Sequence, residues 1–480
     1  MRAVATIATA VLAAAAAGAC GDNLTAPQGP ESPDAAPVDP TLLGHLRALP
    51  GVTAEPTATN TEGYQYIVLH FTQPVDHDDP SGPTFQQEVS LLTKDTTSPM
   101  IVETDGYWDY TLDYPVELTR LTSANQISIE HRYFAASRPD TPDWSKLTVA
   151  QMAADEHAIV TALKTIYTGP YIASGASKGG MTSVYYRRFF PDDVVGTVPY
   201  VAPLSFGAPD TRYAAFLANV GTAPCRAAVR DAAIEMLSHR RAALLQRAQD
   251  EATAMSEGFT RIAIAPALES SILSVEWSFW QYHGGSECGA VPAITATDDD
   301  MWTFLSNVSA VSDNDDDALA AFDVYYYQSE AQLGYPDGGE SSYLGAYEMY
   351  ADVDYSLVYP AGAPVPVYDG GTAMHDIDDF VQHQGSHLLF IYGQWDPWSG
   401  GAFTLGSATD AHLYVQASGT HGSEITHLAT ADRDAALAQI GTWIGAAPLP
   451  PPAEPRIARE PPRVPRVPPA IVRALRSHKT

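Results

Sequence analysis

The feature that most constrains the fold is one serine between two glycines, straight after a short apolar run. Residues 170–177 (PYIASGAS) are typical of a buried strand, and residues 178–190 (KGGMTSVYYRRFF) of a helix. The junction is G-x-S-x-G, in which the serine sits on a sharp strand-to-helix turn and small residues let neighbouring backbone approach. We therefore predict Ser177 as a nucleophile and Gly175 and Gly179 as the glycines that its turn requires.

A serine hydroxyl is a poor nucleophile without a base, and in this arrangement an acid and then a histidine follow at the ends of later strands. Asp396 comes directly after LLFIYGQW, and His421 comes directly after LYVQASGT. Each could be ordinary, since Asp396 precedes Pro397 as turn residues do and His421 could be a loop histidine. His427 is a competing base, but it falls where the last helix should begin.

An oxyanion formed at Ser177 needs two hydrogen-bond donors. The backbone N–H of Lys178, the residue after the nucleophile, should supply one. The loop of TDGYW should supply the other, and we choose the N–H of Tyr107. The alternative is that Gly106 only forms a turn there.

Strand and helix patterns alternate along most of the chain, which predicts an α/β protein with a mostly parallel sheet covered on both faces. We assign residues 41–205 and 367–446 to this unit. Between them, residues 206–366 read as a helical insertion, with a long helical run over 226–255 and clustered aromatic residues.

The two ends of the chain differ from the rest. Residues 1–19 read as a signal peptide, so we expect an exported protein, either secreted or anchored as a lipoprotein through Cys20. Residues 20–40 are predicted to be a flexible linker, and residues 447–480 a Pro-rich, basic, disordered tail. The net charge of −31 argues against nucleic acid as a partner. Attachment to a membrane is expected only through a lipid on Cys20.

Two cysteines remain after export, Cys225 and Cys288, both inside the insertion. Exported chains tend to pair such cysteines, although two free buried thiols are the alternative. We expect no metal site and no cofactor. The acidic runs TDDDMW and SDNDDDAL lack the spaced loop of a calcium site, so solvated turns are the simpler interpretation.

Several segments resemble the secreted bacterial tripeptidyl aminopeptidases and, more distantly, the prolyl carboxypeptidases and dipeptidyl peptidases. These segments are GASKGGMTS, FTQPVDHDD, TFQQEVSLL, IEHRYF, LLFIYGQWDPW and GTHGSEI. The resemblance implies an α/β-hydrolase serine peptidase with a helical cap and the triad Ser177, Asp396 and His421. It also implies cleavage of short peptides from a free N-terminus. Glu130 is a candidate for binding the substrate amine, unless it has a purely structural role beside Arg132.

The leading hypothesis is thus a secreted serine exopeptidase that releases short peptides, tripeptides in the family it resembles. The first alternative is a secreted esterase or lipase, because the same serine turn serves ester chemistry. The second is a surface-binding protein whose hydrolase fold no longer catalyses a reaction.

Overall fold

The computed structural model describes residues 39–351 and 355–446. The predicted signal peptide, Cys20, nearly all of the predicted linker and the basic tail from residue 447 lie outside the described residues. Within the described part, no helix is both long enough and apolar enough to cross a membrane.

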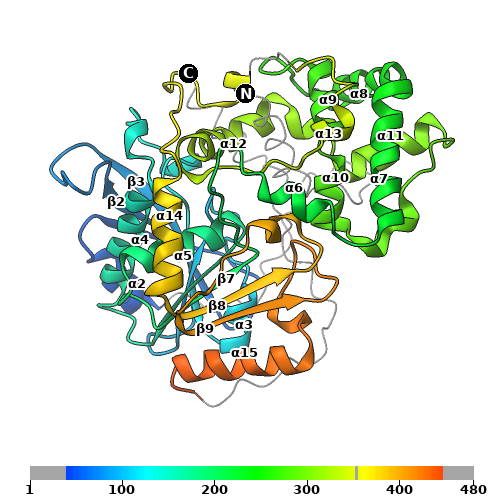
Figure 1. Ribbon diagram of the computed structural model, residues 1–480. Coiled ribbons are helices and arrows are strands. Elements are labelled where there is room, and N and C mark those ends of the chain that lie inside the picture. Colours follow the sequence, from blue (N-terminus) through cyan, green and yellow to red (C-terminus); the bar gives the residue numbers. More distant parts are fainter. Residues whose placement is uncertain (1–38, 352–354, 447–480) are drawn as a thin grey trace.

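A single sheet of nine strands forms the centre of the molecule, in the order β1-β2-β3-β5-β4-β6-β7-β8-β9 (Figure 1). The first three strands run antiparallel to their neighbours, and β5, β4, β6, β7, β8 and β9 are mutually parallel. The strands are β1 (Val52–Thr57), β2 (Gln65–Pro74), β3 (Thr84–Thr93), β4 (Met100–Thr104), β5 (Asn125–Ile129), β6 (Tyr171–Ala176), β7 (Gly196–Tyr200), β8 (Ser386–Gly393) and β9 (Thr409–Gln416). The predicted mostly parallel sheet is confirmed.

Helices cover both faces of this sheet because its central strands are apolar on both sides. β4 and β7 are buried along their whole length. One face packs against α4 (Val149–Leu163), α5 (Lys178–Phe189) and α14 (Thr372–His383), and α2 (Pro40–Arg47) packs on β1. The other face packs against α3 (Glu117–Thr122) and α15 (Thr430–Trp443). This is the α/β-hydrolase fold, as expected.

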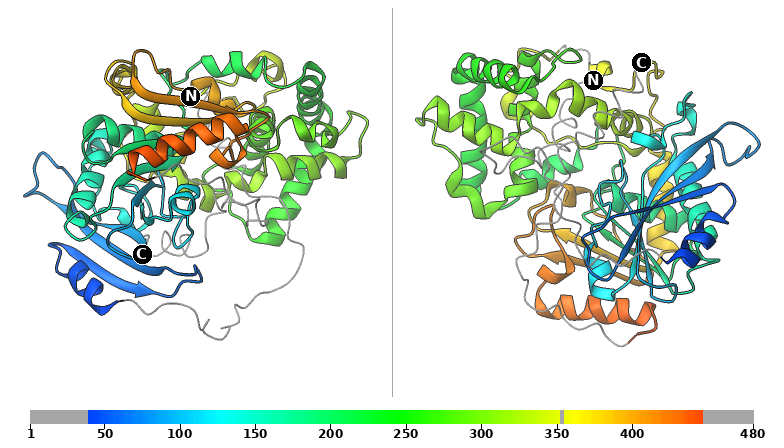
Figure 2. Two further views of the ribbon diagram at one scale, coloured as in Figure 1. Left: turned by 90° about the horizontal axis from the view of Figure 1, so that it is seen from below. Right: turned by 180° about the vertical axis from the view of Figure 1, so that it is seen from behind.

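A group of helices between β7 and α14 stands over one end of the sheet in all views (Figures 1 and 2). The segment between β7 and α14 consists of helices, and the limits of the insertion at residues 206 and 366 stay predictions. Its elements are α6 (Arg212–Leu217), α7 (Ala223–Glu235), η3 (Met236–Arg240), α8 (Arg241–Met255), α9 (Ile264–Leu273), α10 (Val275–Ser278), η4 (Phe279–His283), η5 (Gly285–Ala290), α11 (Asp298–Val308), η6 (Val311–Asn314), α12 (Asp316–Gln328), η7 (Ser329–Leu333), α13 (Ser341–Leu344) and η8 (Tyr355–Val358). We call this insertion the cap.

The two cysteines of the cap are joined. Cys225 in α7 and Cys288 in η5 form a disulfide with their Cα atoms 5.4 Å apart, across a sequence separation of 63 residues. The alternative of two free thiols does not hold. The bridge fixes α7, the first long helix of the cap, to η5. The element before η5 is η4, and residues of η4 reach the candidate active site.

The acidic runs of the cap lie at helix N-termini, where carboxylates accept hydrogen bonds from free backbone N–H groups and favour the helix dipole. Thr297 and Asp300 form a reciprocal capping pair at the start of α11. Asp315 accepts a hydrogen bond from the N–H of Ala318 at the start of α12. Among the described residues, no group of three or more His, Cys, Asp or Glu side chains could hold a metal ion.

Candidate active site

Ser177 lies at the turn between β6 and α5, and its backbone is strained there. Its φ of 57° and ψ of −124° fall in a region that residues with a side chain rarely adopt. The N–H of Ser177 donates to the carbonyl of Tyr200 at the end of β7, 2.9 Å away, which holds the turn on the sheet. The hydroxyl therefore projects from the carboxyl end of the parallel strands, at the N-terminus of a helix.

Glycines on both sides of Ser177 are required by close backbone contacts. A Cβ on Gly175 would lie 2.5 Å from the carbonyl carbon of Gly179, and a Cβ on Gly179 would collide with the carbonyl oxygen of Thr104. A Cβ on Gly106 would lie 2.6 Å from the Gly179 nitrogen. The loop after β4 thus touches the first turn of α5, as the predicted pairing of these two segments requires.

Asp396 and His421 meet at the ends of β8 and β9. His421 Nδ1 lies 2.7 Å from Asp396 Oδ2. The Asp396 side chain is fully buried and that of His421 is 7% exposed, so the pair is shielded from water. The other oxygen of Asp396 accepts a hydrogen bond from the N–H of Trp398, at the start of η9 (Pro397–Gly401). The competing base, His427, is instead exposed in the short helix η10 (Ile425–His427).

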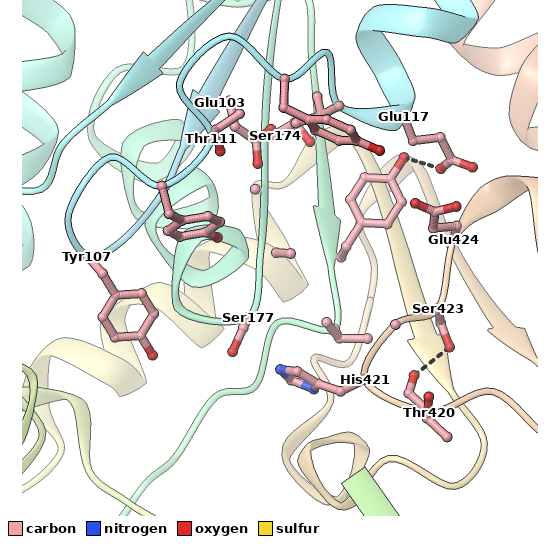
Figure 3. A pocket seen from close by; sticks show the side chains of 18 of the residues that line it. Glu103, Tyr107, Thr111, Glu117, Ser174, Ser177, Thr420, His421, Ser423 and Glu424 are labelled. Atoms are coloured by element: carbon pink, nitrogen blue, oxygen red, sulfur yellow. Dashed lines mark hydrogen bonds between the residues drawn. The ribbon is translucent and has the colours of Figure 1, made fainter. Parts of the chain in front are cut away.

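Ser177 and His421 line the same cavity, which has a volume of about 330 Å³. Figure 3 shows the two side chains projecting into it from neighbouring loops. The cap contributes Tyr282, whose ring stands edge-on to the His421 ring with centroids 6.1 Å apart. The N–H of His421 also donates to the carbonyl of Gln281 in η4, 2.8 Å away. The cap therefore helps to hold the histidine in place.

Lys178 links the two segments that were predicted to supply the oxyanion donors. Its Nζ donates a hydrogen bond to the carbonyl oxygen of Gly106, and it lies 5.4 Å from the ring centroid of Tyr107 and 5.3 Å from that of Phe134. Burial lowers the pKa of Lys178 well below its usual value, and the negative charge of Glu156 raises this pKa by less than burial lowers it. As the first residue of α5, Lys178 has a backbone N–H with no carbonyl one turn earlier to receive it.

The structure does not bring Glu130 to this cavity. Its carboxylate accepts hydrogen bonds from the N–H groups of Asp109 and Ser137, at 3.1 and 2.8 Å. Arg132 does not pair with it either, because the guanidinium binds Asp155 at 2.6 and 2.7 Å. Glu130 thus organises two loops through their backbone, and the prediction that it binds a substrate amine gains no support.

Three other glutamates line the cavity and were missed at the level of sequence: Glu103 in β4, Glu117 in α3 and Glu424 after β9 (Figure 3). The signal for Glu103 was a lone carboxyl within the buried strand MIVET, where charged side chains are rare. Burial raises the pKa of Glu103 to about 8, and burial together with the charge of Glu117 raises that of Glu424 to about 7.

Comparison with known proteins identifies the family. The family described as PS-10 peptidase S37 matches residues 35–463. The chain belongs to the peptidase S37 family. A prolyl tri/tetrapeptidyl aminopeptidase of Streptomyces mobaraensis is 39% identical to this S37 peptidase over 393 residues, which cover 81% of this chain and 82% of that protein. The lysosomal Pro-X carboxypeptidase of Homo sapiens is 27% identical over 192 residues, covering 33% of this chain and 36% of that protein.

Solved structures give more distant matches. A peroxisomal α/β-hydrolase of Saccharomyces cerevisiae is 12% identical, with coverage of 88% of this chain and 98% of that one and a TM-score of 0.37. A proline iminopeptidase of Mycobacterium smegmatis is 14% identical, with coverage of 77% and 96% and a TM-score of 0.35. Membership of the S37 family makes this chain a serine peptidase. The comparisons therefore favour this function over the two alternatives, an esterase and a binding protein without catalytic activity.

Proposed function

We propose that this serine peptidase is exported and releases short peptides, tripeptides foremost, from free N-termini. Ser177 Oγ attacks the scissile carbonyl, and the neutral His421 accepts its proton at Nε2. His421 then protonates the leaving amine, which departs with the rest of the substrate and leaves an acyl-enzyme. Water, deprotonated by His421, releases the peptide and restores Ser177. Asp396 holds the imidazole in the required tautomer and balances its positive charge.

The N–H groups of Lys178 and Tyr107 are proposed to hold the oxyanion. In a trans peptide the C=O and N–H point in opposite directions. The Gly106 carbonyl and the Tyr107 N–H belong to the same peptide group. Because Lys178 Nζ holds this carbonyl, the N–H of Tyr107 points in the opposite direction, away from Lys178 Nζ. Donors fixed in advance in this way stabilise the developing negative charge without reorganising during the reaction.

The observation that carries the mechanism is the 2.7 Å contact between His421 and Asp396, beside a cavity that His421 shares with Ser177. The release of short peptides from free N-termini is supported by the activity in the name of the Streptomyces mobaraensis relative. The cap supports it too, because it stands over this end of the sheet (Figure 1) and its Tyr282 lines the cavity.

The test uses a tripeptide 4-nitroanilide and its N-acetylated form, with wild-type protein and Ser177→Ala. We expect cleavage of the free-amine substrate alone and a loss of activity of at least about 10³-fold in the variant. A fluorophosphonate should label Ser177 in the wild type. Full activity of Ser177→Ala would refute the mechanism, and equal cleavage of both substrates would refute the requirement for a free N-terminus.

A further inference from the structure

The catalytic cavity extends from Ser177 and His421 to a wall that carries carboxyl groups. In β4, Ile101 packs on the sheet face that carries α3 and α15, whereas Thr104 bonds the Gly179 carbonyl on the opposite face. Since side chains alternate along a strand, Glu103 points to the face that carries α3 and α15. In Figure 3, Glu117 and Glu424 lie near one another, and Glu103 lies farther along the lining, beside Ser174. Among the described residues that line this cavity there is no lysine or arginine. The wall therefore offers carboxyl groups without a cation from its own lining to pair with them.

Glu103 has a carboxyl oxygen without a partner among the described residues, as buried Glu156 also has, but of the two only Glu103 lines the cavity. The residue is 5% exposed, and its Oε2 has no hydrogen-bond partner in the described structure. Glu117, by contrast, accepts bonds from Tyr200 Oη and from the N–H groups of Ile425 and Thr426. A buried carboxyl oxygen without a partner is unfavourable, and such groups in native proteins call for a specific explanation. Since Glu103 lines the cavity, a ligand can supply the missing donor.

We propose that this wall is the subsite for the α-ammonium group of the substrate, with Glu103 as its direct partner and Glu424 as a second carboxylate. The proposal rests on the proposed function and assigns its specificity to named residues. Glu424 accepts one long hydrogen bond, 3.4 Å, from the Thr426 hydroxyl, and it is half-buried at the cavity surface. An ammonium group has three donors, so one carboxylate does not use up its hydrogen-bonding capacity.

The position of Glu103 limits the length of the released peptide. Glu103 is paired with Ser174 in the register of β4 and β6. Ser174 precedes Ser177 by three residues, a distance of roughly 10 Å along a strand. An extended peptide spans about 3.3–3.6 Å per residue, so two or three residues fit between the scissile carbonyl and an amine at Glu103.

The rest of the lining also suits a peptide with a free amine. Tyrosine rings line the cavity at five positions: Tyr107, Tyr110, Tyr114, Tyr200 and Tyr282. Such rings pack against apolar side chains and attract a nearby cation through their faces. An acyl chain entering the same cavity would bring its apolar end against the free oxygen of Glu103, which disfavours a lipid ester as the substrate.

The test compares 4-nitroanilides of di-, tri- and tetrapeptides with their des-amino analogues, in which hydrogen replaces the terminal amine. We measure kcat and KM for wild type, Glu103→Gln and Glu424→Gln. The expected result for Glu103→Gln is a fall of about 10–100-fold in kcat/KM for the free-amine substrate, mainly through KM. Cleavage of the des-amino substrate should stay unchanged. Glu424→Gln should show a smaller fall of the same kind.

Glu130→Gln is the matched control, because Glu130 is equally buried and burial likewise raises its pKa to about 8, but it lies outside the cavity lining. Its ratio of free-amine to des-amino kcat/KM should equal that of the wild type. An unchanged ratio in both Glu103→Gln and Glu424→Gln would overturn the proposal. Labelling of Ser177 by a fluorophosphonate shows separately whether each variant keeps a folded, working triad, so failure of the subsite and failure of the proposed function are distinguishable.

Discussion

The side chain of Lys178 donates a hydrogen bond to the carbonyl oxygen of Gly106, from a position where it is 2% exposed. One residue thereby contacts both sides of the predicted oxyanion site. Its backbone opens α5 directly after Ser177, and its amine holds the peptide group whose N–H belongs to Tyr107. The buried lysine thus has a positioning role that the G-x-S-x-G pattern alone does not convey.

Replacing this lysine should slow the chemical step. Lys178→Met keeps the backbone N–H and most of the side-chain volume but leaves the Gly106 carbonyl without its donor. We expect kcat to fall by about 10–100-fold with KM nearly unchanged, because the lost interaction acts on the transition state. Steady-state kinetics on a tripeptide anilide measure this, with a melting curve as the control for folding. A rise in KM at constant kcat would contradict the positioning role.

Asp396→Asn should impair catalysis while leaving the fold intact. The amide would donate toward His421 Nδ1, which favours the tautomer that cannot accept the proton of Ser177. The expected loss in kcat is roughly 10³–10⁴-fold near neutral pH. Kinetics of the purified variant, with a far-UV circular dichroism spectrum as the control, decide the point. Activity within a few-fold of wild type would show that another group orients the histidine.

Removing the disulfide should destabilise the cap. The bridge between Cys225 and Cys288 closes a loop across a sequence separation of 63. The loss of this constraint in the double variant Cys225→Ser/Cys288→Ser corresponds to about 4 kcal/mol by the entropy of loop closure. Differential scanning calorimetry should show a lower Tm than in the wild type. A Tm equal to that of the wild type would mean that packing alone fixes the cap.

Glu103→Gln should raise the Tm of the protein, and increasingly so at higher pH. Burial raises the pKa of Glu103 from 4.5 to about 8, so between these values the folded chain holds a proton that the unfolded chain releases. Wild-type stability is therefore lost as pH rises through this range, by on the order of a few kcal/mol, and glutamine removes that loss. Melting curves at pH 5 and pH 8.5 measure it. A difference in Tm that does not change with pH would contradict the assigned burial.

Patterns of apolar residues sufficed to predict the mostly parallel sheet, because strands and helices follow from local periodicity. Asp396 and His421 were chosen because each follows a predicted strand, and the structure brings them within 2.7 Å of each other. The three glutamates of the cavity lining, Glu103, Glu117 and Glu424, were missed. They are far apart in sequence and share one cavity only in the folded sheet. The partners of Glu130 could not be predicted from the sequence either. Its neighbour Arg132 was the visible partner, whereas its actual partners are backbone groups of two loops.

If Ser177 cuts short peptides from a free N-terminus, the products of a longer peptide show it. An unblocked peptide of about ten residues and its N-acetylated copy are incubated with the wild-type protein, and the products are followed by mass spectrometry. We predict successive release of N-terminal fragments of two or three residues, with tripeptides foremost, from the unblocked peptide and none from the acetylated one. Internal cleavage of both peptides, or equal trimming of the acetylated one, would contradict it.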